Sequence, residues 1–382
     1  MINYHGLFSS AIEKQKKSTM KKLLLTLTVM TMGCMSYAQD DLTAEEITYR
    51  DSIAALNQSN AAITASQNAY NAGIELYKQK NYTGAIAKFA ESITNDPNFT
   101  PAYYNKAVAE NSAEKYNDAI KTLDYLIGLK PAYAKAYFQR GRAYQGLNNY
   151  LSAEKDYQKS IQLDPKSPKA YYNFATLKFL QQDYTAAITQ FTKVIELDPN
   201  DAYAYNDRGS CYRMLEKYPE AVKDYEEASR KNPNLAFVLN NIGTTKMKMK
   251  LYDEAVKAFN RALGVDAQFH LAYNNRGVTF MHMGRVEDAV NDFTKCIEIS
   301  PTYGPAYSNR SGGYFQLKQY DKAKADADKA IELDPKDADA YINRANAKEM
   351  LRDLDGACND WHKARELGSE IGKYYHSGNC SN

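Results

Sequence analysis

The sequence predicts an all-α solenoid made of stacked pairs of antiparallel helices. Seven of the eleven prolines lie on one 34-residue lattice, and the twentieth position of every 34-residue unit is alanine. Apolar or small residues recur within each unit at spacings of three and four, which is typical of one face of a helix. The lattice prolines are Pro97, Pro131, Pro165, Pro199, Pro233, Pro301 and Pro335, and Ala267 occupies the lattice site between Pro233 and Pro301.

Composition and charge narrow the class of protein before any motif is considered. The 382 residues are 44% hydrophobic and 25% charged, which is typical of a globular chain and not of a disordered or collagen-like one. The 48 basic and 46 acidic residues nearly cancel. The chain therefore lacks the strong positive field of a dedicated nucleic-acid binder, and we expect no nucleic-acid partner.

Residues 1–38 are predicted to be a signal peptide. Lys21 and Lys22 precede an apolar run over residues 23–32, and small residues stand three and one positions before Gln39. Met20 resembles the natural start, so residues 1–19 could be an upstream extension. The run is shorter than the roughly 20 residues of a transmembrane helix. We expect an exported protein, periplasmic or secreted, with no transmembrane span.

A lipid anchor is the alternative to simple cleavage after Ala38. Gly33 and Cys34 resemble the end of a bacterial lipoprotein box, in which the cysteine is acylated, but Thr31 stands where that box normally has leucine. The small-residue spacing favours cleavage after Ala38. Acylation at Cys34 would instead tether the protein to the outer membrane.

Residues 39–65 are expected to form an N-terminal capping helix or linker. Thr43 and Glu46 have the spacing of a capping box, which opens a helix that reaches Ala55 or beyond. A cap is expected because an open solenoid end leaves an apolar face in water.

Nine repeating units, each of two helices, account for residues 66–371. Position 8 of each unit is always small and position 20 is always alanine, so the paired helices are expected to cross closely there. Seven units carry an aromatic ring at position 24, and the proline at position 32 ends the second helix. A single pair cannot bury its apolar face, so the units must stack.

The fourth unit shows the pattern most fully. Its residues 171–175 read Tyr-Tyr-Asn-Phe-Ala, followed by Tyr184, Ala187, Phe191 and Pro199. This arrangement resembles the tetratricopeptide repeat family. The resemblance implies a right-handed superhelical solenoid with a concave groove lined by the first helices. The ninth unit ends without proline, so residues 372–382 are expected to be a C-terminal cap or tail.

The sixth position of each unit is polar, and we call this column the amide ladder. The resemblance places it on the groove wall, where an amide can bond to an extended peptide, and the column is similar to the asparagine ladder of the O-linked N-acetylglucosamine transferase. The open alternative is that these residues serve packing between adjacent units. The amide ladder comprises Asn71, Asn105, Gln139, Asn173, Asp207, Asn241, Asn275, Asn309 and Asn343.

Residues at neighbouring groove positions suggest the chemical character of the partner. Position 5 of the first four units is aromatic: Tyr70, Tyr104, Phe138 and Tyr172. Basic candidates, Lys135 and Lys169 among them, outnumber acidic ones, and the acidic ones lie toward the C-terminal units. The hypothesis is therefore a partner segment with some negative charge where it contacts the N-terminal units. The alternative is a glycan- or cell-wall-binding module that uses the aromatic residues as stacking platforms.

Other chemistry is not indicated. The sequence holds no phosphate-binding loop, metalloprotease motif or nucleophile elbow, and its histidines are scattered, so we expect no catalysis, cofactor or metal. Basic residues at position 7 of six units are expected to pack between helices and reach carboxylates or water. Cys211 and Cys296 are expected to be buried free thiols. Cys358 and Cys380 are candidates for a disulfide, with two free thiols as the alternative.

The function expected from these observations is that of a non-enzymatic interaction scaffold or adaptor of the cell envelope. It would bind an extended protein or peptide segment in the groove.

Overall fold

A computed structural model describes residues 44–380, and in this part of the chain every regular element is an α-helix. The described chain belongs to two compact units that divide between Ala65 and Ser66. The predicted signal peptide, Cys34 and the Thr43 capping residue lie outside the described residues. In the first unit, residues 44–65 are the N-terminal part of one long helix, α2 (Ala44–Lys78). Its residues 66–78 belong to the second unit.

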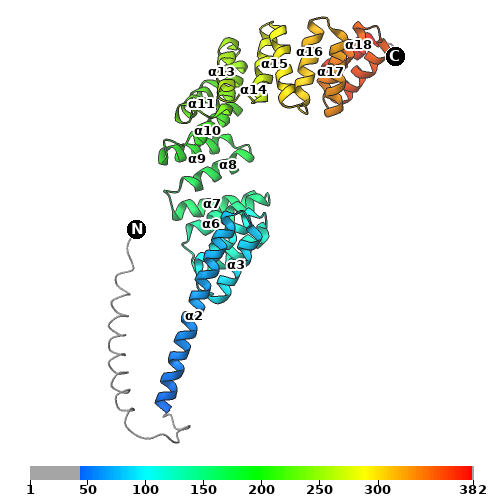
Figure 1. The fold of residues 1–382 in the computed structure, drawn as a ribbon. Helices are drawn as coiled ribbons and strands as arrows, with labels where there is room; N and C mark the ends of the chain where they lie inside the picture. The colour runs from blue at the N-terminus through cyan, green and yellow to red at the C-terminus, as the bar shows by residue number, and fades with distance from the viewer. Residues whose placement is uncertain (1–43, 381–382) are drawn as a thin grey trace. The chain divides into compact units, whose positions relative to one another are not determined.

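The second unit is a row of helix pairs that follow one another in chain order (Figure 1). The last part of α2 is the first helix of repeat one. The first helices of repeats two to nine are α4 (Thr100–Ser112), α6 (Ala134–Gly146), α8 (Pro168–Leu180), α10 (Ala202–Met214), α12 (Ala236–Lys248), α14 (His270–His282), α16 (Gly304–Gln316) and α18 (Ala338–Met350). The second helices are α3 (Tyr82–Asn95), α5 (Tyr116–Leu129), α7 (Tyr150–Leu163), α9 (Tyr184–Leu197), α11 (Tyr218–Lys231), α13 (Tyr252–Val265), α15 (Val286–Ile299), α17 (Tyr320–Leu333) and α19 (Leu354–Glu366). Their bounds repeat every 34 residues, except that α19 is one residue shorter.

The turn between the two helices of a repeat has one geometry throughout. Its position 15 residue is left-handed in all nine repeats, with φ between 57° and 72°. Only the seventh repeat places a glycine there, Gly284; the other eight hold a non-glycine residue such as Glu216. The next residue donates its backbone N–H to the carbonyl five residues earlier, as from Lys217 to Tyr212 at 2.9 Å. This bond is typical of the Schellman ending of a helix.

The turn between repeats explains the proline lattice. In six of the turns, an Asp or Asn at position 31 accepts the backbone N–H of the residue two positions later, as Asp164 does from Lys166 at 3.2 Å. In five of these six turns the residue between them is the lattice proline, whose missing N–H costs nothing there. Asp266 makes the same bond to Gln268 at 2.9 Å around Ala267, so the turn forms without the proline.

Within each repeat, the small residues at positions 8 and 20 let the helices approach. The position 20 alanines are fully buried. A Cβ added to Gly243 would lie 2.6 Å from a ring carbon of Phe259, which is too close for any side chain. The aromatic ring at position 24 therefore fills the space that the glycine at position 8 leaves in its own repeat.

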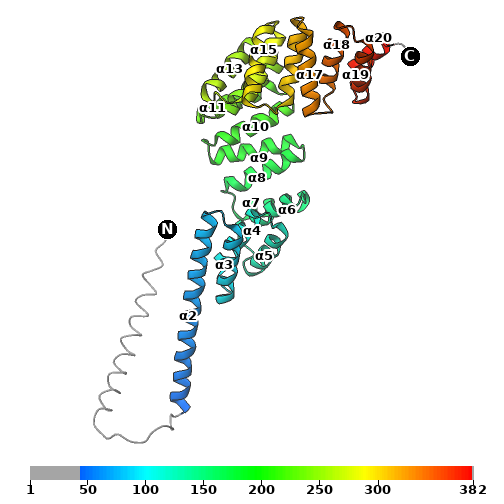
Figure 2. The same cartoon turned by 45° about the vertical axis from the view of Figure 1, so that its right-hand side comes forward.

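The last repeat is covered by a further helix, α20 (Glu370–Asn379) (Figure 2). The rings of Tyr375 on α20 and Trp361 on α19 stack with centroids 5.4 Å apart. A disulfide joins Cys358 to Cys380 beside this contact. Cys211 and Cys296 are free and buried.

Candidate functional site

The amide ladder makes one recurring bond between neighbouring repeats. In seven repeats a ladder side chain bonds to the position 5 residue of the preceding repeat, 35 residues earlier. Asn241, Asn275 and Asn309 each donate Nδ2 to an asparagine Oδ1 at 3.0 Å. Asn105 donates to the Tyr70 hydroxyl at 2.8 Å, Gln139 to the Tyr104 hydroxyl at 3.4 Å, and Asn343 to the Ser308 backbone carbonyl at 2.9 Å. In the remaining pair the direction is reversed, and the Tyr172 hydroxyl donates to Asp207.

The N–H groups and the oxygens of the ladder amides have different surroundings. The amide N–H groups hold adjacent repeats together, and the position 5 acceptors Asn206, Asn240 and Asn274 are buried. The amide oxygens of Asn241, Asn275 and Asn309 accept no hydrogen bond from the described residues, so they can still accept one from a ligand.

Two ladder positions depart from the pattern at the aromatic end. Asn173 follows Phe138, which has no acceptor, and donates its Nδ2 to the Lys169 carbonyl at 2.9 Å instead. Asn71, in the first repeat, accepts at Oδ1 from Gln67 at 3.1 Å. Neither residue bonds to a preceding repeat.

Asp207 is the only acid in the ladder, and neighbouring groups donate hydrogen bonds to its carboxylate. It accepts a hydrogen bond from the Tyr172 hydroxyl and a second from Asn206 Nδ2 at 2.9 Å. Burial raises the pKa of Asp207 above its ordinary value, and the two hydrogen bonds oppose that rise. Burial, with the neighbouring Asp207 carboxylate, also raises the pKa of Tyr172. At the junction of repeats four and five the amide ladder therefore carries a titratable carboxyl group where the other repeats have a neutral amide.

A hollow of about 490 Å³ lies on the first-helix face of repeats two to four, and we call it the basic hollow. Lys135 and Lys169 hold position 2 of consecutive repeats here, and Arg142 adds a third positive charge from position 9. Asp164 is the one acid among the lining residues. The lining is Tyr104, Ala134, Lys135, Phe138, Gln139, Arg142, Ser160, Asp164, Ser167, Lys169 and Asn173.

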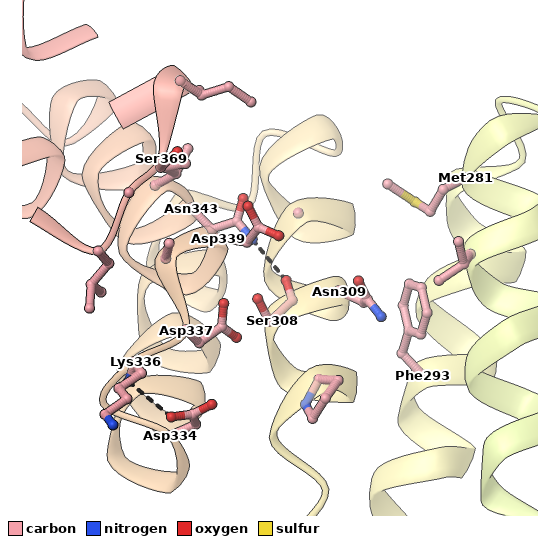
Figure 3. Close-up of a pocket in the computed structure, with 18 of the residues that line it drawn as sticks. Met281, Phe293, Ser308, Asn309, Asp334, Lys336, Asp337, Asp339, Asn343 and Ser369 are labelled. Atoms are coloured by element: carbon pink, nitrogen blue, oxygen red, sulfur yellow. Dashed lines mark hydrogen bonds between the residues drawn. The ribbon is translucent and has the colours of Figure 1, made fainter. Parts of the chain in front are cut away.

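A second hollow of about 870 Å³ lies on the same positions of repeats seven to nine, and we call it the acidic hollow (Figure 3). Asp337, Asp339 and Asn343, at the start of α18 and within it, share this space with Ser308 and Asn309 of α16. Asp334 and Lys336 also line it, so three carboxylates face one ammonium group. Asp339 holds position 2, where the basic hollow has lysine. The first-helix face therefore changes charge along the chain.

The aromatic residues of position 5 are partly used by the repeats themselves. Tyr104 and Phe138 line the basic hollow, whereas Tyr70 and Tyr172 line neither hollow. Tyr70 packs edge-on against Phe99 with centroids 5.0 Å apart, and Tyr172 packs edge-on against Phe191 at 5.4 Å. All four rings are half-buried. Their faces are therefore not fully open to a ligand.

The position 7 arginines form an ion-pair network within and between repeats, and their expected carboxylate partners are at position 23. In five repeats the arginine donates two bonds to an aspartate at position 23 of its own repeat, 16 residues later, and Nη1 reaches position 25 of the preceding repeat. The pairs are Arg140–Asp156, Arg208–Asp224, Arg276–Asp292, Arg310–Asp326 and Arg344–Asp360. The signal was present in the sequence: position 23 is aspartate only in these five repeats.

Between residues 44 and 380, no group of three or more His, Cys, Asp or Glu side chains is placed to hold a metal ion. None of the helices in this part of the chain combines the length and apolarity required to cross a membrane.

Models of known protein families match most of the chain. A model described as ETO1 C-terminal domain matches residues 41–311, and two models described as tetratricopeptide repeat match residues 304–337 and 327–359. The chain belongs to the tetratricopeptide repeat family and, over residues 41–311, to the ETO1 C-terminal domain family. The predicted repeat family and solenoid fold are thereby confirmed. No curated protein sequence matches this tetratricopeptide repeat protein.

Solved structures are similar in fold. A tetratricopeptide repeat protein from Parabacteroides merdae is 20% identical with a TM-score of 0.53, and the match covers 64% of this chain and 97% of that one. The C-terminal part of a repeat protein from Cytophaga hutchinsonii is 19% identical with a TM-score of 0.53, covering 63% and 98%. At this identity the likeness concerns the fold alone. Tetratricopeptide repeat proteins generally act as non-catalytic scaffolds for protein–protein interaction.

Proposed function

We propose that this protein is a non-enzymatic adaptor that binds an extended, acidic segment of another protein along its first-helix face. The observation that carries the proposal is the basic hollow, in which Lys135, Lys169 and Arg142 line one space of about 490 Å³. A carboxylate-bearing peptide would meet three positive charges against one negative charge there.

The basic hollow offers directional contacts as well as charge. Lys135 and Lys169 are exposed and in no ion pair with the described residues, so their ammonium groups remain available. Arg142 Nη1 bonds to Gln139 Oε1 at 3.3 Å, which holds the guanidinium beside the ladder. Each exposed charge pair with a ligand contributes up to about 1 kcal/mol, and salt weakens it.

The amide ladder would extend the binding surface. An extended peptide presents backbone N–H groups at regular intervals, and the amide oxygens of Asn241, Asn275 and Asn309 are suited to accept them. The charged contacts would set where the acidic part lies, while the ladder would hold the backbone.

A glycan-binding role is less favoured. Sugar stacking needs an open aromatic face, whereas Tyr70 and Tyr172 are half-buried and packed edge-on against rings of their own repeats. Tyr104 is likewise edge-on to Tyr133, at 5.6 Å.

Peptide display tests the proposal without a known partner. A library of random linear peptides is selected against the whole protein, and affinities of the recovered peptides are measured over a range of salt. We expect recovered peptides to be rich in Asp and Glu. The double variant Lys135→Glu/Lys169→Glu should weaken them at least about tenfold at low salt, because two attractions become repulsions.

The matched control is Lys121→Glu/Lys155→Glu, which makes the same charge change on exposed positions of α5 and α7 outside both hollows. It should leave affinity within about twofold, as expected for charges more than a Debye length away or facing elsewhere. Equal losses in the two variants, or recovered peptides without acidic enrichment, would overturn the proposal.

Export to the periplasm or the cell exterior is part of the proposal. The signal-like pattern of residues 1–38 and the pairing of Cys358 with Cys380 both support an oxidising compartment. The mass of the mature N-terminal peptide distinguishes the routes: a start at Gln39 indicates simple cleavage, an acylated Cys34 indicates a lipid anchor, and an intact N-terminus contradicts export.

A further inference from the structure

The described part of the first unit carries an exposed apolar stripe that no other described residue covers. Along the N-terminal part of α2, Tyr49 is 55% exposed, Ile53 39%, Leu56 57% and Ile63 54%. The other residues of the same stretch are alanine or polar. Large apolar side chains aligned on one exposed helix face are unusual unless a partner covers them.

The spacing of the stripe follows a heptad repeat. Tyr49, Ile53, Leu56 and Ile63 are separated by four, three and seven residues, and Asn60 stands at the place between the last two. With Ile53 at position a, Leu56 and Ile63 are at d and Asn60 is at a. A β-branched residue at a with leucine at d favours two-stranded parallel coiled coils. An asparagine at a single a position specifies register and number of strands in such coils.

We propose that residues 49–63 of α2 pair with the same residues of a second copy of this chain in a parallel two-stranded coiled coil. The side chains that the proposal buries are self-complementary: Leu56 would meet Leu56, Ile63 would meet Ile63, and the two Asn60 amides would bond to each other. In any other register an amide would lie against an apolar side chain, at the cost of an unsatisfied buried polar group.

The composition of this stretch argues against a membrane surface as the occupant. Helices that lie on membranes usually carry Lys and Arg along the polar face. Between residues 49 and 65, the charged side chains are Arg50 and Asp51, which form an exposed ion pair at 3.8 Å. This stretch therefore has no net positive charge that would attract anionic lipid. Pairing with a second identical helix depends on apolar contacts and requires no net charge.

Cysteine crosslinking in the whole protein tests the pairing and its direction. Leu56→Cys places a thiol at d, next to its symmetry mate in a parallel coil. Gln58→Cys, two residues away, places one at the outward position f. Under mild oxidation we expect a covalent dimer from Leu56→Cys at least about tenfold faster than from Gln58→Cys, because only the first pair falls within the disulfide limit of roughly 7 Å between Cα atoms.

Solution mass provides a second readout that does not depend on crosslinking. The unmodified protein should show a concentration-dependent monomer–dimer equilibrium in sedimentation. Leu56→Glu should be monomeric at every concentration, while Gln58→Glu should match the parent. Asn60→Leu should strengthen association and add species larger than a dimer, because the residue that specifies two strands is gone.

The proposal would be overturned by a monomer for the unmodified protein throughout the dilution series, by equal crosslinking of the two cysteine variants, or by a dimer that persists in Leu56→Glu. Binding to anionic vesicles that Leu56→Glu abolishes, without dimerisation in solution, would assign the stripe to a membrane instead and equally overturn it. Circular dichroism of each variant verifies that the solenoid remains folded.

Discussion

Arg208 and Asp224 form a two-bond ion pair between the two helices of repeat five, and the same guanidinium also bonds to repeat four. Arg208 donates Nε to one carboxylate oxygen at 2.7 Å and Nη2 to the other at 2.8 Å, and its Nη1 reaches the Thr192 hydroxyl on α9 at 3.0 Å. The guanidinium also lies 5.7 Å from the Tyr205 ring centroid. Asp224 is buried, so its carboxylate is not hydrated and Arg208 supplies its hydrogen bonds and its compensating charge.

Breaking this pair should cost far more than replacing it. Arg208→Ile leaves Asp224 buried and uncompensated, and we expect about 3 kcal/mol of destabilisation in urea unfolding. The double variant Arg208→Ile/Asp224→Ala should lie within about 1 kcal/mol of the parent. Repeat six supplies the template, because it carries Ile242 and Ala258 at the same two positions, both buried. If the double variant is as unstable as the single one, the pair stabilises the fold in its own right and the prediction is wrong.

The buried carboxyl of Asp207 should give a measurable pH dependence. Burial raises its folded pKa above the unfolded value of about 3.8, so the folded state holds this proton more tightly. Its contribution is fully present below that unfolded value and is lost as pH rises through the folded pKa. Asp207→Asn removes the titration. The stability of the parent relative to Asp207→Asn should therefore fall as pH rises above about 3.8, until Asp207 is ionised in the folded state.

Tyr172→Phe should enlarge that pH dependence. The Tyr172 hydroxyl donates to the carboxylate and lowers the pKa of Asp207, so its loss lets burial raise the pKa further. Unfolding curves of parent, Asp207→Asn and Tyr172→Phe at several pH values decide the matter. Parallel stability–pH profiles in all three proteins would contradict the assignment.

Two glycine-to-alanine changes should act in opposite directions. Gly284 has φ of +72° at position 15, and Gly264 lies within α13; an added Cβ would meet no atom within 4 Å at either place. Gly284→Ala should destabilise by about 1 kcal/mol, because left-handed backbone disfavours a Cβ. Gly264→Ala should stabilise by about 0.5 kcal/mol through helix propensity. Thermal unfolding of both variants measures the difference, and shifts of the same sign would refute the backbone explanation.

Trp361 should report on the Cys358–Cys380 disulfide. It is the only tryptophan in the chain, it is 1% exposed, and Tyr375 of α20 stacks on it. The disulfide closes a segment with a sequence separation of 22, so its loss should cost about 3 kcal/mol, mainly in the last repeat. Reduction should shift the tryptophan emission to the red and increase quenching by acrylamide.

Cys358→Ser is the matched control for that experiment. It should show the shifted emission before reduction and no further change upon it. Burial raises the pKa of Cys211 to about 12 and that of Cys296 to about 11, so neither thiol should react in the folded protein at neutral pH. Emission that is the same in reduced and oxidised parent would mean that α20 covers Trp361 without help from the disulfide.

The amide ladder shows where prediction from sequence reaches its limit. The column at position 6 is visible in the sequence, yet a peptide-binding ladder and a framework between repeats predict the same residues. The bonds from Asn241 to Asn206 and from Asn275 to Asn240 join residues 35 apart in separate repeats. Such a contact depends on how far one repeat is displaced against the next, and no local pattern encodes that displacement.

The arginine network could have been found earlier. Arg140 and Asp156 are 16 positions apart on two helices of one repeat, and the same offset recurs in four other repeats. Where arginine is missing, as at Phe174 and Ile242, position 23 is not aspartate. The joint presence and absence of the two residues is a signal of contact within a single sequence, because an internal repeat samples the same contact many times.

By itself the sequence determined the helix pairs, their 34-residue period and the repeat family, because helix periodicity, turn residues and close-packing residues act over a few neighbouring positions and recur nine times. Only the tertiary structure decided which side chains meet across repeats, and that Lys135 and Lys169 share one hollow while Asp337 and Asp339 share another. Those neighbours are brought together by stacking, and their separation in space follows from packing distances between helices that the chain order alone leaves undefined.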